Sequence, residues 1–361
     1  MSLSVEQVQS ALQSLIDPNT QKDFISTKSA KNIKVDGDKV SLDLVLSYPA
    51  RMVSAEIGKM VEDSVKAVGA TECRVSVTWK VVAHGVQKGV KLIPGVKNII
   101  AVASGKGGVG KSTTAVNLAL GLAAEGASVG MLDADIYGPS QPTMLGIHGR
   151  PESADGQSLE PMIGHGLQAM SIGFLIDVET PMVWRGPMVT QALEQLLNQT
   201  KWKDLDYLVV DLPPGTGDIQ LTLAQRVPVT GAVIVTTPQD IALIDARKGL
   251  KMFEKVGVPI LGIVENMSIH ICTNCGHEER IFGEGGGERM CKDYGVEFLG
   301  GLPLDMHIRE DADGGKPSVV ADPSSRVAEI YRAIARRVAV MVGDLAVDHS
   351  SKFPSIVIQN T

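Results

Sequence analysis

Residues 105–113 read "GKGGVGKST", a glycine-rich stretch whose composition suits the binding of phosphate groups. Glycines let backbone N–H groups surround phosphates, and a helix that begins at the end of such a loop adds a favourable dipole. In the pattern of glycine, four residues and then Gly-Lys-Ser, the lysine contacts the β- and γ-phosphates of ATP and the serine binds Mg²⁺, which assigns these roles to Lys111 and Ser112. The residues predicted to bind nucleotide are Gly105, Lys106, Gly107, Gly108, Val109, Gly110, Lys111, Ser112 and Thr113. A phosphate loop needs one lysine, so the second, Lys106, requires a separate explanation.

Three carboxylates downstream are candidates to serve a bound magnesium nucleotide. Asp211 in "YLVVDLPPGTGD" ends an apolar segment, and a carboxylate at the carboxyl end of such a strand holds Mg²⁺ through water. Asp133 and Asp135 in "MLDADIYGPS" follow another apolar segment, where one of them can orient the attacking water. An aspartate that ends a strand can also be an ordinary turn or cap residue. The neighbouring phosphate loop favours the catalytic interpretation.

The cysteines suggest a metal site. The chain has four, Cys73, Cys272, Cys275 and Cys291, which are too few and too unevenly spaced for a disulfide framework in 361 residues. The close pair Cys272-x-x-Cys275 instead indicates metal binding or redox chemistry. Together with His277 and Cys291 it could surround a zinc ion, although a regular zinc ribbon has a second close pair. Cys73 lies in a predicted strand and is interpreted as a small buried apolar residue.

The phosphate loop follows an apolar segment, and similar segments recur after it. Strands are predicted at 98–104, 128–135, 166–173, 206–213, 231–238 and 259–267, with a helix from Lys111 to about Glu125. Strands this apolar, separated by helical stretches, predict an α/β fold of the P-loop NTPase type, with a mainly parallel sheet covered by helices on both faces. Residues 92–345 are expected to form this domain. The Cys-x-x-Cys is then expected after the last core strand, on the side of the sheet where ligands gather.

The first 91 residues follow a different pattern. Helical spacing at 5–17 and 54–69, and period-two alternation at 39–48 and 73–82, predict a small α+β domain followed by a linker. The last residues, 346–361, are expected to form a loose tail.

Charge and hydropathy exclude several classes of partner. The net charge is −7 and no cluster of Lys and Arg is present, which argues against a nucleic-acid binder. No apolar run approaches the ~18 to 20 residues of a membrane span, and the N-terminus lacks the pattern of a secretory signal. We therefore expect a cytoplasmic protein with no membrane partner.

The lysine directly after the first glycine makes "GKGGVGKST" resemble the deviant phosphate loop of a family of dimeric ATPases. This family includes the nitrogenase iron protein, the arsenite-pump ATPase and the Min and Par positioning ATPases. The resemblance implies that Lys106 crosses a dimer interface to the partner's nucleotide, in the manner of an arginine finger supplied in trans. It also implies that Asp135 orients the hydrolytic water, that Asp211 is linked to Mg²⁺, and that Asn266 in "VENMS" contacts adenine.

Within that family, the chain resembles the bacterial iron–sulfur cluster carrier ATPases of the Mrp type, also called ApbC, over nearly its whole length. The motifs are "DADIYGPSQP", "WRGPM", "DLPPGTGD" and the Cys-x-x-Cys. The resemblance implies a homodimer that receives a labile [4Fe-4S] cluster from a scaffold or donor protein and transfers it to apoproteins, with slow ATP hydrolysis. Because a [4Fe-4S] cluster normally has four thiolate ligands, Cys272 and Cys275 from each of two subunits would complete the set. Cys291 then has an accessory or structural role.

Residues 1–90 resemble the small MIP18-like domain of iron–sulfur assembly proteins. Such domains often carry a cysteine in the loop before their second helix, where this chain has "SYPARM". A direct role of this domain in holding the cluster is therefore not expected.

Two other functions fit parts of the sequence. One is a membrane- or DNA-associated positioning ATPase with a structural zinc site, but the tail "SSKFPSIVIQNT" lacks a lysine-rich amphipathic helix and no basic patch is present. The other is an electron-transfer ATPase similar to the nitrogenase iron protein, in which the cluster ligands are widely separated cysteines.

Overall fold

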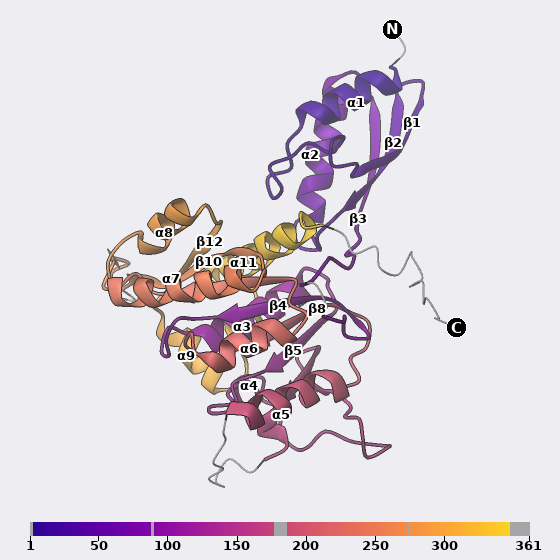
Figure 1. The fold of residues 1–361 in the computed structure, drawn as a ribbon. Coiled ribbons are helices and arrows are strands. Elements are labelled where there is room, and N and C mark those ends of the chain that lie inside the picture. The colour runs from indigo at the N-terminus through magenta and orange to yellow at the C-terminus, as the bar shows by residue number, and fades with distance from the viewer. Residues whose placement is uncertain (1–2, 88–89, 177–185, 273, 347–361) are drawn as a thin grey trace.

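The computed structural model describes residues 3–87, 90–176, 186–272 and 274–346, and within these ranges the chain forms two separate β-sheets (Figure 1). Residues 347–361 of the predicted loose tail, and residues 184 and 185 of the motif "WRGPM", lie outside the described residues.

The smaller sheet belongs to the N-terminal part of the chain. Strands β1 (Ala30–Asp36), β2 (Lys39–Leu46) and β3 (Glu72–Trp79) lie in that order, with β1 antiparallel to β2 and β2 parallel to β3. Helices α1 (Val5–Ser14) and α2 (Ser54–Ala67) pack against this sheet. This arrangement confirms the predicted small α+β unit and adds β1, a strand that the sequence analysis did not place.

Sequence patterns explain these elements. Alternate residues of β2 are buried, namely Val40, Leu42, Leu44 and Leu46, because a strand covered on one face alternates apolar and polar side chains. At the start of α1, Ser4 and Gln7 form a reciprocal capping box. Strand β1 alternates less regularly because Asn32 has a positive φ and the register with β2 shifts nearby.

The larger sheet contains nine strands within the described part of the chain. Their order is β11-β10-β9-β4-β8-β5-β7-β6, and β12 also pairs with β10. All pairs are parallel except β6 with β7 and β10 with β11. The strands are β4 (Val96–Ala103), β5 (Val129–Asp133), β6 (Met162–Gly164), β7 (Leu167–Ser171), β8 (Leu205–Asp211), β9 (Gly231–Thr236), β10 (Ile260–Ile271), β11 (Glu278–Glu279) and β12 (Phe298–Pro303).

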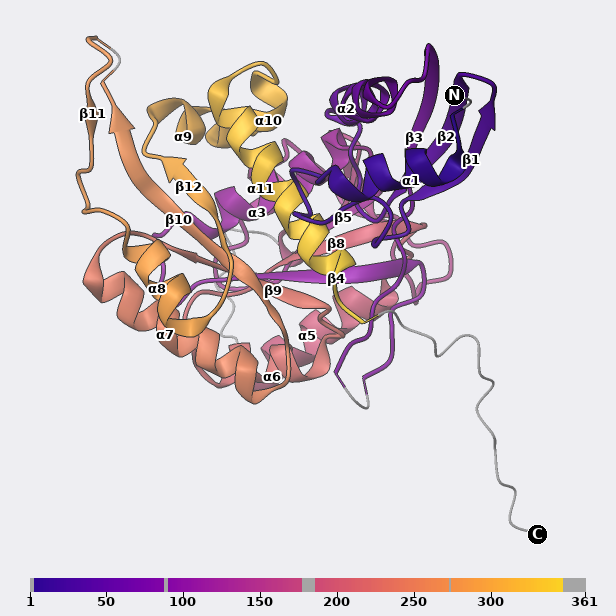
Figure 2. The same cartoon turned by 90° about the horizontal axis from the view of Figure 1, so that it is seen from above.

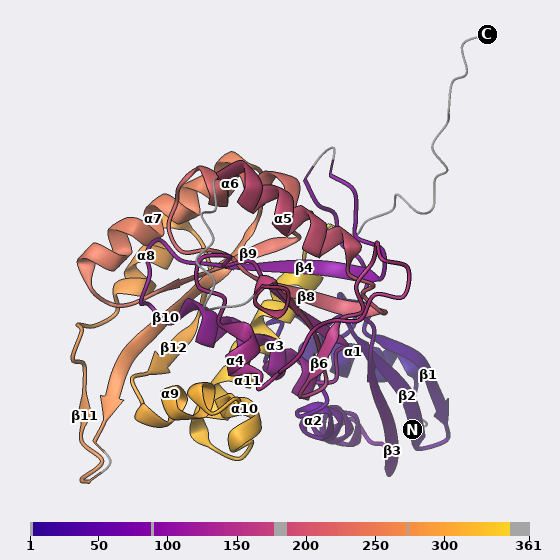
Figure 3. The ribbon, with the colours of Figure 1, turned by 90° about the horizontal axis from the view of Figure 1, so that it is seen from below.

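Helices lie on both faces of this sheet, as predicted (Figures 1 and 3). On one side are α3 (Lys111–Ala124), α4 (Gln141–Met144), α9 (Met306–Asp313), α10 (Ser318–Ala321) and α11 (Arg326–Gly343). On the other are α5 (Gly186–Gln199), α6 (Asp218–Arg226), α7 (Asp240–Lys255) and α8 (Gly286–Tyr294). The central strands β4, β8 and β9 are buried along nearly their whole length, which explains their unbroken apolar sequences. Among the described helices, none has both the length and the apolar character needed to cross a membrane.

The edge of the sheet near the cysteine pair differs from expectation. Strand β10 continues to Ile271, beyond the predicted end at 267, and β12 then pairs parallel to it. Cys272 directly follows this strand, as expected, but β10 is not the last core strand, because β12 comes later in the chain. The sequence of β12, "FLGGLP", contains two glycines, which interrupt the apolar run by which strands are recognised.

The two sheets are joined by contacts at the end of α3. Glu125, fully buried, accepts hydrogen bonds from the backbone N–H of Arg51 to its carbonyl oxygen at 2.9 Å and from that of Met52 to its Oε2 at 3.1 Å. Its other carboxylate oxygen pairs with Arg336 of α11. The helix that begins at the phosphate loop thus ends against the N-terminal domain.

Candidate functional site

The stretch 104–110 connects the end of β4 with the start of α3, the strand-loop-helix context predicted from the sequence. Gly108 and Gly110 have positive φ angles of 80° and 79°, which side chains disfavour. At Gly105 a Cβ atom would lie 2.1 Å from the carbonyl carbon of Asp245 in α7. The loop therefore needs glycine for its conformation at two positions and for its contact with α7 at a third.

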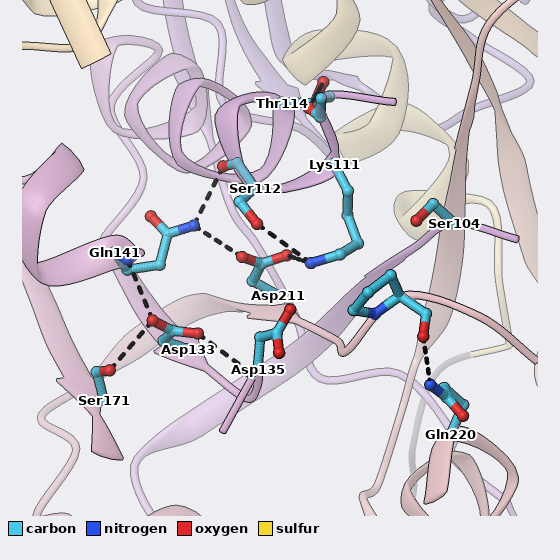
Figure 4. A network of polar contacts seen from close by, with 12 residues as sticks. Ser104, Lys111, Ser112, Thr114, Asp133, Asp135, Gln141, Ser171, Asp211 and Gln220 are labelled. Atoms are coloured by element: carbon cyan, nitrogen blue, oxygen red, sulfur yellow. Dashed lines mark hydrogen bonds and ion pairs between the residues drawn. The ribbon is translucent and has the colours of Figure 1, made fainter. Parts of the chain in front are cut away.

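Lys111, Ser112 and Asp211 form a buried polar network at the end of this loop (Figure 4). The Lys111 ammonium forms an ion pair with Asp211 Oδ1 and lies 3.2 Å from Ser112 Oγ. Asp211 ends β8, the strand beside β4, and is completely buried. Because an isolated buried charge is very costly, the two opposite charges stabilise one another.

Asp133 and Asp135 follow β5, next to β8, but have different surroundings. Asp133 is completely buried, and its carboxylate accepts hydrogen bonds, each 3.1 Å long, from Ser171 Oγ and the backbone N–H groups of Asp135 and Gln141. Burial, together with the negative charge of Asp211, raises the pKa of Asp133. Asp135 is only half-buried, and burial raises its pKa as well. Asp133 therefore organises the loop, whereas Asp135 has the exposure that a water-orienting residue needs.

The oxygen atoms of this network suit Mg²⁺. Ser112 Oγ and the Asp211 carboxylate both contact the same Lys111 ammonium, so they lie close to one another. Magnesium is bound by hydroxyl, carboxylate, water and phosphate oxygens. The residues present therefore fit the predicted arrangement, in which Ser112 is a direct ligand and Asp211 acts through water.

Gln141 belongs to the same network, although the sequence analysis did not assign it to the site. It begins α4, is 1% exposed, and donates from Nε2 to Asp211 Oδ2 at 2.9 Å and to the carbonyl oxygen of Ser112 at 3.1 Å. The sequence "GPSQP" marks a turn and a helix start. No pattern in it indicates that the glutamine side chain points inward.

Two further residues predicted to serve the nucleotide are Asn266 and Lys106. Asn266, a residue of β10, is buried and donates from Nδ2 to the carbonyl oxygen of Val109 at 2.9 Å. This contact braces the phosphate loop, and the adenine contact stays a prediction. Lys106 is half-buried and forms no ion pair within the described part of this chain. Its predicted role across a dimer is likewise untested.

Cys272 and Cys275 lie at the tip of the hairpin formed by β10 and β11, which extends from the edge of the sheet (Figures 2 and 3). The backbone N–H of Cys272 donates to the carbonyl oxygen of His277 at 2.9 Å, and that of Gly276 donates to the carbonyl oxygen of Cys272 at 2.8 Å. Cys275 is exposed and Cys272 is half-buried. Hydrogen bonds from backbone N–H groups lower the pKa of the Cys272 thiol, with the larger effect from Cys275 and the smaller from Asn274. These features suit thiolate ligands that bind a metal at the surface.

The four residues considered for a zinc site do not come together in the structure; they are Cys272, Cys275, His277 and Cys291. Cys291 lies in α8, is 5% exposed, and its Sγ lies 3.4 Å from the carbonyl oxygen of Glu297. Burial raises the pKa of Cys291 to about 12. Among the residues that the structure describes, no group of three or more His, Cys, Asp or Glu side chains is arranged to hold a metal ion. One chain therefore offers two thiols at the hairpin, and Cys291 belongs to the core.

Relatives identify the two parts of the chain. A family model described as "NUBPL iron-transfer P-loop NTPase" matches residues 95–339, and one described as "Iron-sulfur cluster assembly protein" matches residues 5–77. The "Iron-sulfur cluster carrier protein" of Escherichia coli strain K12 is 53% identical over 331 residues, covering 90% of this chain and 89% of that protein. The "Iron-sulfur cluster transfer protein NUBPL" of Mus musculus is 51% identical over 261 residues, covering 72% and 82%.

Solved structures agree with the fold. A nucleotide-binding protein from Archaeoglobus fulgidus, solved in complex with ADP, is 38% identical and covers 65% of this chain and 92% of its own, with a TM-score of 0.57. The cell division ATPase MinD from Pyrococcus furiosus is 23% identical and covers 67% and 98%, with a TM-score of 0.50, and shares the fold. With a family model matching more than half of its length and relatives at this identity, the chain belongs to the NUBPL iron-transfer P-loop NTPase family.

Proposed function

We propose that this protein is an ATP-dependent iron–sulfur cluster carrier. It binds magnesium nucleotide at the loop 105–113 and carries a labile [4Fe-4S] cluster as cargo between two copies of the chain. The observation that carries the proposal is the hairpin with two surface thiols, Cys272 and Cys275, on a domain that also holds the Lys111–Asp211 network. Relatives at about half identity over most of the chain are named as cluster carriers.

The nucleotide site supports slow ATP hydrolysis. In this proposal Lys111 contacts the phosphates, Ser112 and Asp211 hold Mg²⁺, and Asp135 orients the attacking water. When bound, Mg²⁺ supplies charge stabilisation to the phosphate oxygens. Turnover is slow because the loop that carries Asp135 and a lysine from a second subunit must come together first.

A homodimer accounts for the surplus lysine. Lys106 has no ion-pair partner within the described part of its own chain, and in trans it would bring positive charge to the partner's nucleotide only when two subunits close. The start of α7 carries two exposed isoleucines, Ile241 at 70% and Ile244 at 51% exposure. They lie within one turn of Asp245, whose backbone abuts the phosphate loop. An exposed apolar surface beside the nucleotide site fits a subunit interface.

The number of thiolate ligands indicates where the cluster binds. A [4Fe-4S] cluster normally takes four thiolates, and one hairpin supplies two. Two-fold symmetry completes the set if the hairpins of two subunits meet at the axis. A cluster at two exposed tips is accessible to donor and recipient proteins, which suits transfer. A reducing compartment keeps such thiols available, so we place the protein in the cytoplasm.

Anaerobic reconstitution tests this proposal. We expect about four irons and four sulfides per dimer. Cys272→Ala or Cys275→Ala should remove the cluster. Cys291→Ala should leave most of it, because Cys291 is buried in α8 and, among the described residues, belongs to no group that could hold a metal ion.

Iron, sulfide and zinc content per dimer is the measurement. The matched control is Cys73→Ala, which removes another buried thiol. One tightly held zinc per monomer that depends on Cys291 would overturn the proposal.

A further inference from the structure

Gln141 connects three elements of the nucleotide site (Figure 4). Its side-chain nitrogen contacts Asp211 at the end of β8 and the carbonyl oxygen of Ser112 in the first turn of α3, while its own backbone begins α4. Because only 1% of its surface is exposed, water does not compete for these hydrogen bonds, and they fix the position of the side chain. A neutral side chain thus touches the carboxylate assigned to Mg²⁺ and the helix that carries the phosphate-binding lysine.

The chemistry of its neighbours fixes the orientation of the amide. Asp211 Oδ2 and the Ser112 carbonyl oxygen are both acceptors, so the NH₂ group of Gln141 must face them. Asp211 then has a donor on each oxygen, Lys111 on Oδ1 and Gln141 on Oδ2. When Lys111 contacts phosphate, Gln141 is the donor that continues to hold the carboxylate in place.

This orientation has a cost. Gln141 Oε1 is buried and has no hydrogen-bond partner in the part of the chain that the structure describes, and an unsatisfied buried acceptor destabilises a fold. A leucine or methionine would avoid that cost. A residue that is unfavourable for stability but well placed at a site indicates a functional constraint.

The backbone of Gln141 extends the connection to the water-orienting loop. Its N–H donates to Asp133 Oδ2 at 3.1 Å, and Asp133 Oδ1 accepts from the backbone N–H of Asp135, also at 3.1 Å. Gln141 and Asp133 thereby link the segment that carries Asp135 to the segment that carries Lys111 and Ser112.

We propose that Gln141 is a positioning residue for ATP hydrolysis: its amide holds the Asp211 carboxylate in the orientation that serves Mg²⁺ and sets the position of the Asp135 loop against the phosphate loop. This inference rests on the proposed ATPase function. An amide is suited to the task because it donates two hydrogen bonds without adding charge. A glutamate would place a third carboxylate beside Asp133 and Asp211, and a leucine would leave Asp211 Oδ2 without its donor.

The test compares Gln141→Leu, Gln141→Glu and a control, Gln195→Leu, which makes the same change at an exposed position of α5. Three quantities are measured for each: the affinity for a fluorescent ADP analogue with Mg²⁺ and with EDTA, kcat and KM for ATP, and the thermal unfolding midpoint without nucleotide. For Gln141→Leu we expect an unchanged affinity in EDTA. We expect an about tenfold loss of both the Mg²⁺-dependent gain in affinity and kcat, the usual effect of losing a hydrogen bond to a charged group.

Gln141→Glu should lose more than Gln141→Leu in both quantities, and Gln195→Leu should match the wild type. Wild-type kcat and Mg²⁺ dependence in Gln141→Leu would overturn the inference, as would an equal loss of affinity with and without Mg²⁺, which is the signature of a purely structural role. If Gln141→Leu does not fold, Gln141→Met gives the same test because its flexible thioether fills irregular buried space.

Lys111→Ala separates this inference from the proposed function. If Lys111→Ala binds nucleotide like the wild type, the nucleotide site itself is wrong, whatever Gln141 does.

Discussion

At the scale of single residues, the four cysteine thiols differ in exposure and in ionisation. Cys275 is exposed and Cys272 half-buried, whereas Cys73 and Cys291 are buried. Hydrogen bonds from backbone N–H groups lower the pKa of Cys272, and burial raises the pKa of Cys73 and Cys291. Because the thiolate is the reactive form, we expect iodoacetamide at neutral pH to label Cys272 and Cys275 in the reduced, cluster-free protein before the other two react.

Mass spectrometry of tryptic peptides over a time course measures this order. Labelling in denaturant is the control, since all four thiols should then react at similar rates. Early labelling of Cys291 in the folded protein would contradict its burial in α8. Loading the cluster should protect Cys272 and Cys275 if they are its ligands.

Residues fixed by a motif could be predicted from the sequence. The structure brings Lys111, Ser112 and Asp211 together as expected, because the phosphate loop and the end of a neighbouring parallel strand meet at one edge of a sheet. Gln141 could not be predicted, since its role depends on a short helix that turns its side chain inward. Their spacing left Asp133 and Asp135 equivalent, and the family resemblance selected Asp135; the structure adds that Asp133 is fully buried whereas Asp135 is half-buried.

At the scale of elements, the contact between the phosphate loop and α7 depends on a missing side chain. A Cβ atom at Gly105 would overlap the backbone of Asp245, whereas nothing lies within 4 Å of one at Gly107. We expect Gly105→Ala to lower the free energy of unfolding by about 1–3 kcal/mol, the usual cost of overpacking. Nucleotide affinity should fall with it, because α7 and the loop must separate.

Chemical denaturation and nucleotide titration measure both effects. Gly107→Ala is the matched control in the same loop, and it should change stability by no more than about 0.5 kcal/mol. Equal stabilities of the two variants would show that α7 adjusts to the extra methyl group without cost.

The predicted elements were those with strong patterns. Central strands such as β4, β8 and β9 were found because burial on both faces requires apolar residues throughout. Strand β12 was missed because glycines interrupt it, and the two-residue β11 is too short to have a period. Edge strands depend more on their neighbours than on their own sequence.

At the scale of the whole molecule, the dimer can be tested by complementation. If Lys106 acts in trans, Lys106→Ala and Asp135→Ala homodimers should each bind nucleotide but hydrolyse it poorly. A heterodimer of the two has one composite site with both residues intact. Equal mixing should therefore restore about a quarter of wild-type ATPase activity, because half of randomly formed dimers are mixed and each has one working site.

Differently tagged subunits, copurified, show whether heterodimers form. Mixing Asp135→Ala with Lys111→Ala is a further control: each subunit then lacks a residue that acts on its own nucleotide, so no working site should form. Copurified heterodimers without recovered activity would show that Lys106 acts within its own subunit.

Strand β10 has a consequence for how the chain can vary. It carries Asn266, which contacts the phosphate loop, and leads directly to Cys272, six residues later. Six fully extended residues would span about 20 Å, and the separation here is shorter because Met267 has a positive φ of 55° and the register with β12 shifts between Glu265 and Ile269. Successive side chains of a strand point to opposite faces of the sheet. Inserting one residue would therefore turn the thiols to the opposite face, whereas inserting two would lengthen the hairpin and keep the thiols on the same face. We therefore expect natural single-residue insertions to be excluded between 267 and 271 and tolerated at the hairpin tip, where only the loop closure changes.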